Sequence, residues 1–290
     1  MRIVFNDVSY SYSLGTPFVH KALDHITTEI EEGTYVAVIG QTGSGKSTLL
    51  QHLNALILPT EGSIVIGDRE IIAGQKMKNL KSLRKKVGIV FQFPEHQLFE
   101  ETVLKDVMFG PLNFGSSEEE AKQLALEALQ MVGLKEDVYD KSPFDLSGGQ
   151  MRRVAIAGVL AMEPNVLVLD EPSAGLDPRG RKEIMDMFYR LHKERKMTTV
   201  LVTHTMEDAS NFADKIIILN KGKIVKEGTP KEIFSNPDEL LEMSLDVPDV
   251  VKFQSHVEKV LGYKLSTIHL TPETLASEIA SLENKEEPSC

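Results

Sequence analysis

The stretch GQTGSGKS, Gly40–Ser47, decides how the rest of this sequence is interpreted. It follows the continuously apolar run TYVAVIG, residues 34–40, which is typical of a buried strand, and a helical pattern continues from about Lys46 to Ala55. The stretch matches the pattern G-x-x-x-x-G-K-[S/T], in which glycines let backbone N–H groups surround phosphates at a helix N-terminus. The sequence therefore predicts a strand, a phosphate-binding loop and a helix, and with them nucleotide binding.

Individual residues of this loop have separate expected roles. We expect Lys46 to reach the β- and γ-phosphates, and the Ser47 hydroxyl to bind Mg²⁺, a hard ion that prefers oxygen donors. Thr48 is expected to contact the α-phosphate. The alternative, a flexible Gly/Ser turn, is disfavoured by the strand before the loop and the helix after it. The full set of expected phosphate-binding residues is Gly40, Gln41, Thr42, Gly43, Ser44, Gly45, Lys46, Ser47 and Thr48.

Two carboxylates end a second apolar run, LVLDE, Leu167–Glu171. In open α/β sheets ligands bind at the carboxyl ends of the strands, so we expect Asp170 to assist Mg²⁺ and Glu171 to polarise an attacking water. A helix-capping acidic pair is the alternative. His204 ends the run TVLVTH at the same edge, where it could bond the γ-phosphate or Glu171. No His/Cys cluster has zinc-ligand spacing, so Mg²⁺ is the metal that we infer.

Further apolar runs indicate an α/β fold. Those at residues 87–91, 166–170, 198–203 and 215–220, separated mostly by helical patterns, predict a largely parallel sheet. Alternating runs at 3–12 and 22–30 predict a small antiparallel β-layer. Residues of about 102–162 have helical periodicity and are expected to form a helical subdomain. We expect this α/β unit to span 1–230 and a C-terminal helical extension to span 231–290, with a disordered tail from Glu283.

Composition narrows the possible partners and location. The 290 residues have a formal net charge of −11, which argues against a nucleic-acid partner, because phosphate backbones are bound by basic surfaces. No apolar run approaches the ~20 residues of a membrane span, so other chains would have to hold the protein at a membrane. The only cysteine is Cys290, which excludes an internal disulfide and favours a cytosolic environment.

The motif LSGGQ, Leu146–Gln150, gives the chain a second glycine-rich helix start. With this motif the sequence resembles ABC-type ATPases, whose P-loop NTPase core carries an antiparallel β-layer and a helical subdomain. The resemblance implies that two subunits pack head to tail and that each completes the other's ATP site. The residues that would act in trans are Ser147, Gly148, Gly149, Gln150 and, from SAGLD, Asp177.

Other marks of that family follow in order. Gln92 matches the Q-loop glutamine, which implies a catalytic role and a place among the Mg²⁺ ligands, and His204 matches the switch histidine. Lys46, Gln92, Glu171 and His204 are therefore the expected catalytic residues. Tyr12 matches the aromatic residue that stacks on adenine, although Tyr10 is a competing candidate and either could be an ordinary strand aromatic.

A narrower resemblance is carried by FQFPEHQLFEETVLKDVMFGPLNFG, Phe91–Gly115, and by LGTPFVHKAL, Leu14–Leu23. These segments look like an ATPase subunit of bacterial energy-coupling factor (ECF) transporters, most like the second of two paralogues in a shared module. The resemblance implies ATP-driven uptake of vitamins or metal ions from the cytoplasmic face of the membrane. The implied partners are a paralogous ATPase, a transmembrane coupling protein and small substrate-binding membrane proteins.

Two surfaces are expected to contact these partners. The C-terminal helices would bury an apolar face in the ATPase dimer: Val250, Phe253, Val257, Val260 and Leu261. The acids Glu95, Glu100 and Glu101 lie beside Phe93, Leu98 and Phe99, and in ECF transporters the coupling protein presents arginines to such a groove. Alternatively, the three glutamates form a solvated face and first-turn acids of the next helix.

Three other functions remain open at this level. A soluble ABC protein of translation or DNA repair usually has two ATPase domains or a long coiled coil, and neither is present in this sequence. A subunit that binds ATP without hydrolysing it would lack the base or the switch histidine. A conventional ABC importer for sugars or amino acids would act with a periplasmic-type binding protein rather than with small membrane-embedded receptors.

Overall fold

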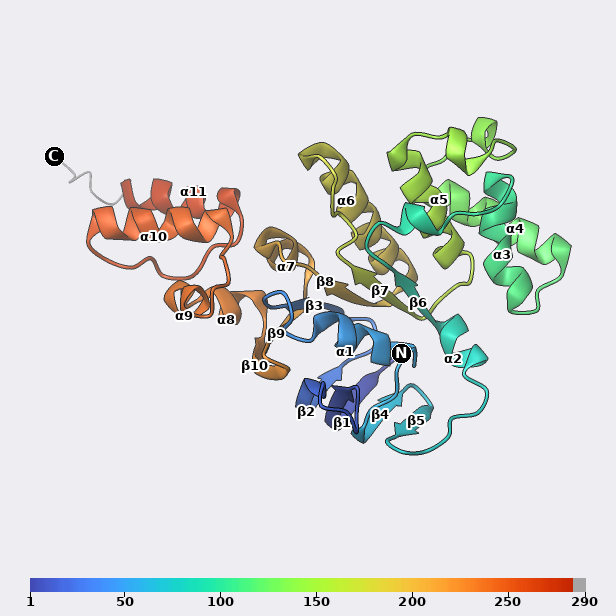
Figure 1. The fold of residues 1–290 in the computed structure, drawn as a ribbon. Coiled ribbons are helices and arrows are strands. Elements are labelled where there is room, and N and C mark those ends of the chain that lie inside the picture. The colour runs from blue at the N-terminus through green and yellow to red at the C-terminus, as the bar shows by residue number, and fades with distance from the viewer. Residues whose placement is uncertain (284–290) are drawn as a thin grey trace.

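The protein is described by a computed structural model that defines residues 1–283, with two sheets flanked by helices (Figure 1). The expected disordered tail, apart from Glu283 itself, lies outside the described residues. The strands are β1 (Ile3–Tyr12), β2 (His20–Ile30), β3 (Tyr35–Ile39), β4 (Glu61–Ile66), β5 (Arg69–Ile72), β6 (Val87–Val90), β7 (Val166–Asp170), β8 (Thr198–Val202), β9 (Lys215–Asn220) and β10 (Lys223–Gly228).

The larger sheet has the strand order β10-β9-β3-β8-β7-β6. Its five strands from β9 to β6 pair in parallel, and β10 returns antiparallel from β9. In the register of these pairs, Val38 of β3 lies opposite Val202 of β8, and Leu201 lies opposite Leu169 of β7. The predicted parallel core is confirmed, and its register brings the carboxyl ends of β3, β7 and β8 to one edge.

The smaller sheet is an antiparallel layer of order β2-β1-β4-β5. The sequence predicted only β1 and β2, so the expected two-stranded layer is corrected to four strands. The additional strands are short, and the second residue of β4 is a glycine, Gly62, which weakens a strand pattern. Sheet pairing defines them, since β4 pairs with β1 and β5 pairs with β4. Ile64 of β4 lies opposite Phe5 of β1, and both are fully buried.

Helices cover the larger sheet and extend to both sides of it. The segment expected to be helical, 102–162, contains α3 to α5, which stand apart as a lobe in Figure 1. The described chain after Gly228 contains α8 to α11, and α10 and α11 lie side by side at the other end of the molecule. The α-helices are α1 (Lys46–Leu53), α2 (Lys81–Lys86), α3 (Val103–Asn113), α4 (Glu118–Met131), α5 (Gly148–Leu160), α6 (Pro178–Arg195), α7 (Met206–Phe212), α8 (Pro230–Phe234), α9 (Pro237–Glu242), α10 (Asp249–Leu261) and α11 (Pro272–Glu283).

Three short 3-10 helices connect these elements: η1 (Pro94–Gln97), η2 (Glu136–Val138) and η3 (Pro143–Asp145).

The apolar core lies on both faces of the larger sheet. One cluster joins Leu167 and Leu169 to the helical lobe, and another joins Val166 and Val168 to α1 and the antiparallel layer. Alternate side chains of one strand thus hold the two flanking layers, because successive residues of a strand point to opposite faces.

The β1–β4 pairing depends on a glycine, which gives a prediction about stability. Gly62 has φ +79°, and a Cβ there would lie 2.3 Å from the Asp7 carbonyl oxygen, at a bulge in β1. Gly74 has φ +75° with nothing within 4 Å, so it is a matched control that has the same strain without the clash. We expect Gly74→Ala to cost about 1 kcal/mol and Gly62→Ala about 3 kcal/mol of unfolding free energy, measured by urea denaturation. Equal losses in the two variants would contradict the account of the bulge.

Candidate functional site

The loop between β3 and α1 places a lysine over a glycine-rich turn. Gly45 has φ +106°, and a Cβ there would lie 2.6 Å from the Ala22 carbonyl oxygen, so only glycine fits at this position. The Lys46 ammonium donates hydrogen bonds to the carbonyl oxygens of Gly40, at 2.7 Å, and Gln41, at 2.9 Å. The predicted strand, loop and helix are therefore present, with the lysine folded across the mouth of the loop.

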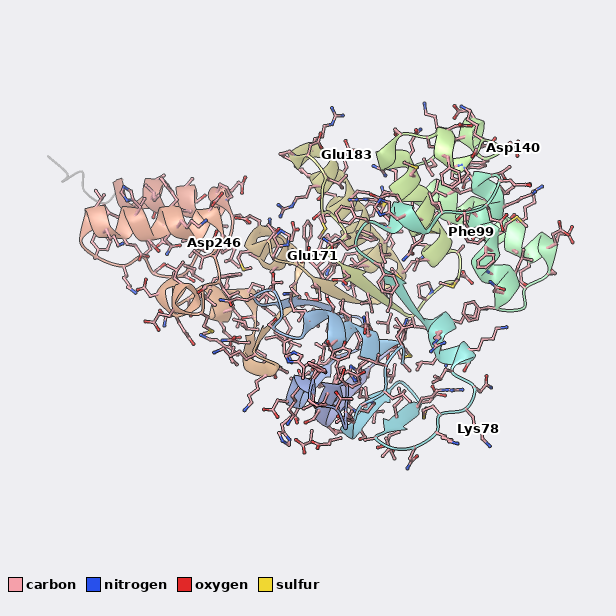
Figure 2. The ribbon with its side chains drawn as sticks, in the orientation of Figure 1. Lys78, Phe99, Asp140, Glu171, Glu183 and Asp246 are labelled. Atoms are coloured by element: carbon pink, nitrogen blue, oxygen red, sulfur yellow. The ribbon has the colours of Figure 1, made fainter. Side chains whose placement is uncertain are left out.

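A carboxylate with two polar neighbours lies beside that loop. Glu171 follows β7 with φ +47°, a left-handed conformation that is uncommon and strained for a non-glycine residue, and its N–H donates to the Val202 carbonyl oxygen at 3.0 Å. Gln92 Nε2 donates to Glu171 Oε2 at 3.3 Å, and His204 Nδ1 lies 3.3 Å from Glu171 Oε1. The structure thus brings Gln92 and His204 to Glu171, although the three residues are far apart in the sequence. Figure 2 labels Glu171 in the middle of the molecule.

Burial shifts the pKa values of the two charged groups nearest to Glu171. Burial raises the pKa of Asp170, and the neighbouring Glu171 carboxylate adds to this effect while Lys46 opposes it. Burial lowers the pKa of Lys46, against the attraction of Glu171 and Asp170. The site therefore holds two acids close to one lysine in partly desolvated surroundings, an arrangement suited to a ligand that brings both negative charge and a cation.

These groups line a cavity of about 440 Å³. Tyr12 is at its rim, 38% exposed, with its hydroxyl 3.2 Å from Thr48 Oγ1, whereas Tyr10 packs edge-on against the ring of buried His52. Of the two aromatic candidates, only Tyr12 faces the cavity. The lining residues are Tyr12, His20, Ala22, Thr42, Gly43, Gly45, Lys46, Ser47, Thr48, Gln92, Asp170, Glu171 and Val202.

The C-terminal segment also reaches the loop, which the sequence did not indicate. Gln41 Nε2 donates to the Met243 carbonyl oxygen at 2.8 Å. Ser244 and Asp246 line an adjoining cavity of about 550 Å³ together with Lys46, His204 and other residues. Figure 2 shows Asp246 on the side of Glu171 that faces α10. No motif marks this segment, because its place at the site depends on how the chain returns after β10.

The LSGGQ segment lies outside the cavity of its own chain, since none of its residues lines it. Ser147 caps α5, and Gln150 closes a capping box with it. Gly148 and Gly149 have open space where a Cβ would lie. Asp177 caps α6 in the same way, by accepting from the Gly180 N–H at 2.6 Å. The second glycine-rich helix start is thus present and uncovered, away from the first.

The structure corrects one of the proposed docking acids. Glu95 is not a surface group: its side chain is 14% exposed and forms a bidentate ion pair with Arg152, which is 3% exposed. An acid already paired inside the chain cannot take a partner's arginine, so the expected docking role of Glu95 is wrong. Glu101 pairs with Lys105 at 2.7 Å, and Glu100 is half-buried, with its N–H bonded to Asp106.

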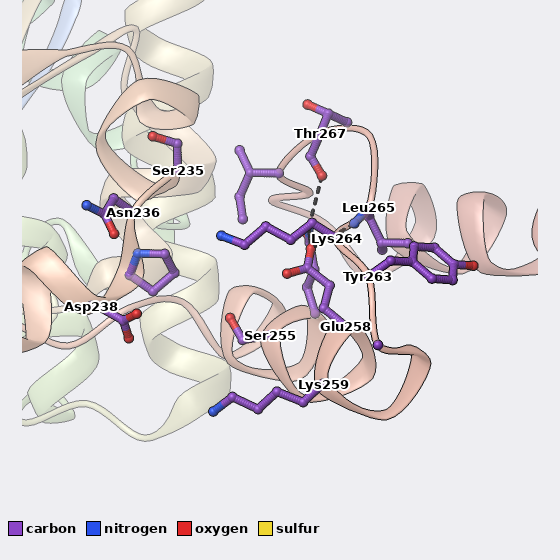
Figure 3. Close-up of a pocket in the computed structure, with 14 residues that line it drawn as sticks. Ser235, Asn236, Asp238, Ser255, Glu258, Lys259, Tyr263, Lys264, Leu265 and Thr267 are labelled. Atoms are coloured by element: carbon purple, nitrogen blue, oxygen red, sulfur yellow. Dashed lines mark hydrogen bonds between the residues drawn. The ribbon is translucent and has the colours of Figure 1, made fainter.

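A separate cavity of about 440 Å³ lies in the C-terminal extension (Figure 3). Its lining has mixed charge, with Lys259 and Lys264 near Asp238 and Glu258. Glu258 already accepts hydrogen bonds from the Gln254 amide and the Leu265 N–H. The cavity therefore offers no concentrated charge of either sign to a ligand.

Comparisons with known proteins agree with the geometry of the site. The profile of the ABC transporter family matches residues 23–174. The energy-coupling factor transporter ATP-binding protein EcfA2 of Bacillus licheniformis is 59% identical over 286 residues, which cover 99% of both chains. EcfA2 of Bacillus subtilis is 62% identical over 267 residues, which cover 92% of this chain and 97% of that protein.

The chain belongs to the ATP-binding proteins of ECF transporters, within the ABC family. It is therefore an ATP-binding subunit whose ATP hydrolysis is coupled to transport, as the motifs predicted.

Solved structures support the same fold. One is cbiO1 of Clostridium perfringens, described as part of the ABC transporter complex cbiONQ, with TM-score 0.73 and 37% identity, covering 87% of this chain and 98% of that one. Another is a dimeric ATP-binding cassette in a post-hydrolysis state with ADP and Pi, with TM-score 0.69 and 35% identity, covering 79% and 98%. No helix in the described part of this ECF ATPase is long and apolar enough to span a bilayer.

The position of Tyr12 generates a prediction about ATP affinity. If its ring stacks on adenine, Tyr12→Ala should weaken ATP binding by about 10-fold or more, the usual scale of base–aromatic stacking, while Tyr12→Phe should retain most of the affinity. Tyr10→Ala, as the control on the same strand, should lower stability more than affinity, because Tyr10 packs on His52 and supports the Tyr12 ring edge-on at 4.8 Å but does not line the cavity. Binding is measured by titration with a fluorescent ATP analogue. A larger loss for Tyr10→Ala than for Tyr12→Ala would contradict this assignment.

Proposed function

We propose that this ECF ATPase binds Mg-ATP at Gly40–Thr48 and hydrolyses it with Glu171 as the residue that polarises water. The observation that carries the proposal is the position of the Glu171 carboxylate, bonded to Gln92 and near His204, in the cavity that Lys46 also lines. A base within hydrogen-bond reach of the attacking water needs this kind of support to keep its orientation.

The residues present fit a magnesium ion. Ser47, Gln92 and Asp170 line one cavity and offer a hydroxyl, an amide carbonyl and a carboxylate, which are the oxygen donors that Mg²⁺ prefers. The Gln92 amide nitrogen donates a hydrogen bond to Glu171, so the Gln92 carbonyl oxygen remains available to a metal. When bound, Mg²⁺ would neutralise negative charge on the phosphates.

The chain's own groups then have distinct tasks. Backbone N–H groups of the loop and the Lys46 ammonium bind the phosphates, while Glu171 orients water and accepts its proton. His204, 3.3 Å from Glu171, is placed to hold this carboxylate or to contact the γ-phosphate. Because Glu171 Oε1 and Oε2 have different neighbours, rotation of the carboxylate is restricted before substrate binds.

The uncovered signature segment supports a shared ATP site. We assign Ser147, Gly148, Gly149, Gln150 and Asp177 to the nucleotide bound by a partner ATPase, because none of them lines the cavity of this chain. The open glycine positions at the start of α5 leave N–H groups accessible to an anion. The side chains of Ser147 and Asp177 already cap helices, so their helix starts are fixed before the partner arrives.

The partners are proposed as a paralogous ATPase, a transmembrane coupling protein and small membrane proteins that bind vitamins or other micronutrients. These chains would hold the ATPase at the cytoplasmic face of a bacterial membrane. Phe99, two residues after η1, and Phe109 and Leu112 of α3 are exposed, and the rings of Phe99 and Phe109 meet edge to face at 4.8 Å. This apolar surface, flanked by Glu100 and Glu101, is the proposed docking place for the coupling protein.

A division into an ATPase domain, 1–230, and a helical extension, 231–290, accompanies this proposal. Within the described part of the extension, α10 and α11 border an apolar groove that includes Val250, Phe253, Leu275 and Ile279. Phe253 is 57% and Val260 is 75% exposed, so the face predicted from the sequence is uncovered in the single chain. We propose that the partner ATPase covers it, because an exposed face of this kind marks an interaction site.

The proposed base is tested by substitution. Glu171→Gln should leave ATP binding within about threefold of the original and reduce turnover by about 10²- to 10⁴-fold, the scale of general-base removal. Lys46→Ala should instead weaken binding, since the ammonium contacts ground-state phosphates. Steady-state ATPase rates and direct binding titrations of the assembled ATPase pair separate the two effects. Near-normal turnover by ATP-bound Glu171→Gln would rule out this role.

A further inference from the structure

Arg152 joins two segments that carry functional motifs. It lies on α5, two residues after Gln150 of the signature motif, and its side chain is 3% exposed. Its Nε donates to Glu95 Oε2 at 2.9 Å, and its Nη2 donates to Glu95 Oε1 at 2.7 Å. Glu95 belongs to η1, three residues after Gln92. The ion pair therefore links the signature helix to the segment that positions Gln92.

The same guanidinium reaches a third segment. Arg152 Nη1 donates to the carbonyl oxygens of Ala174, at 2.9 Å, and Pro172, at 3.3 Å, which follow directly after Glu171. The Phe93 ring covers the guanidinium, whose carbon is 5.8 Å from the ring centroid. One buried cation thus contacts the chain next to Gln92, next to Glu171 and next to the signature motif.

Only arginine can make this set of bonds. Its planar fork donates from three nitrogens in fixed directions, two toward one carboxylate and one toward backbone carbonyls, whereas a lysine ammonium is a compact charge without such a fork. Because the pair is buried, removal of either partner leaves the other charge uncompensated. Removal also frees η1 and the turn after Glu171 from α5.

We propose that Arg152, paired with Glu95, is a positioning residue that holds Gln92 and Glu171 in register with the signature helix. The signature motif would act on the partner's nucleotide, whereas Glu171 would act on the nucleotide of its own chain. The Arg152–Glu95 ion pair, which we call the clamp, therefore makes the geometry of this chain's ATP site depend on contact between its signature motif and the partner's nucleotide. The inference rests on the proposed roles of Glu171 and of the signature motif in trans. Arg152 itself does not line the cavity beside the phosphate loop.

The test uses the ATPase pair with a catalytically inactive partner, so that turnover reports this chain's own site. Arg152→Gln and Glu95→Gln should each lower kcat by about 10- to 100-fold, the cost of a small misplacement of reacting groups, with KM changed less than about threefold. The double variant should lose little more than either single one, because both remove the same contact. Arg152→Lys, which keeps the charge but not the fork, should retain an intermediate kcat.

Arg153 provides the matched control on the same helix. Its guanidinium bonds the Val132 carbonyl oxygen and Glu183, away from Gln92 and Glu171. Arg153→Gln should lower Tm without the loss of kcat. Equal kcat for Arg152→Gln and Arg153→Gln, or additive losses in the Glu95/Arg152 double variant, would overturn the clamp. Undiminished turnover by Glu171→Gln in the same pair would instead refute the proposed base.

Discussion

Parallel pairing of β3, β8 and β7 is the constraint on which the rest of the structure depends. The parallel register, in which Val38 lies opposite Val202 and Leu201 lies opposite Leu169, fixes where each strand ends. The phosphate loop, the Asp170–Glu171 pair and His204 all follow those ends, so their proximity results from the sheet itself. The strained backbone at Glu171 is accepted there because the sheet and the Val202 carbonyl hold it in place.

Much of the fold and of the site could be predicted from the sequence because their signals are local. One such signal is the apolar run before Gly40, which ends in the glycine spacing of the loop. Another is the pair of carboxylates after Leu169. Each signal specifies both where a strand ends and which functional groups follow it. The strands β4 and β5 were missed because β4 is stabilised by pairing with β1 and β5 by pairing with β4, and no local motif marks these contacts. The contact of Gln41 with Met243 was missed because it joins residues distant along the chain and has no motif.

Glu95 shows most clearly what sequence reasoning could not resolve. A glutamate beside aromatic residues has the same pattern whether its carboxylate faces solvent or a buried arginine, and Arg152 is 57 residues away. The structure distinguishes the two cases by the burial of Glu95. Its inferred role therefore changes from docking a partner chain to pairing with Arg152 inside its own chain. The exposed aromatics Phe99 and Phe109 remain on the surface next to it.

The single chain brings Lys46, Asp170 and Glu171 to one cavity and leaves other surfaces uncovered. Gly148 and Gly149 are open, and the faces of α10 and α11 and of α3 are apolar and exposed.

The most direct test is a mixed ATPase pair in which only this chain carries Ser147→Ala, with turnover measured separately at each P-loop by inactivating the other. The account predicts that the partner's P-loop loses turnover while this chain's own ATP binding is kept. A loss confined to this chain's own P-loop would contradict it.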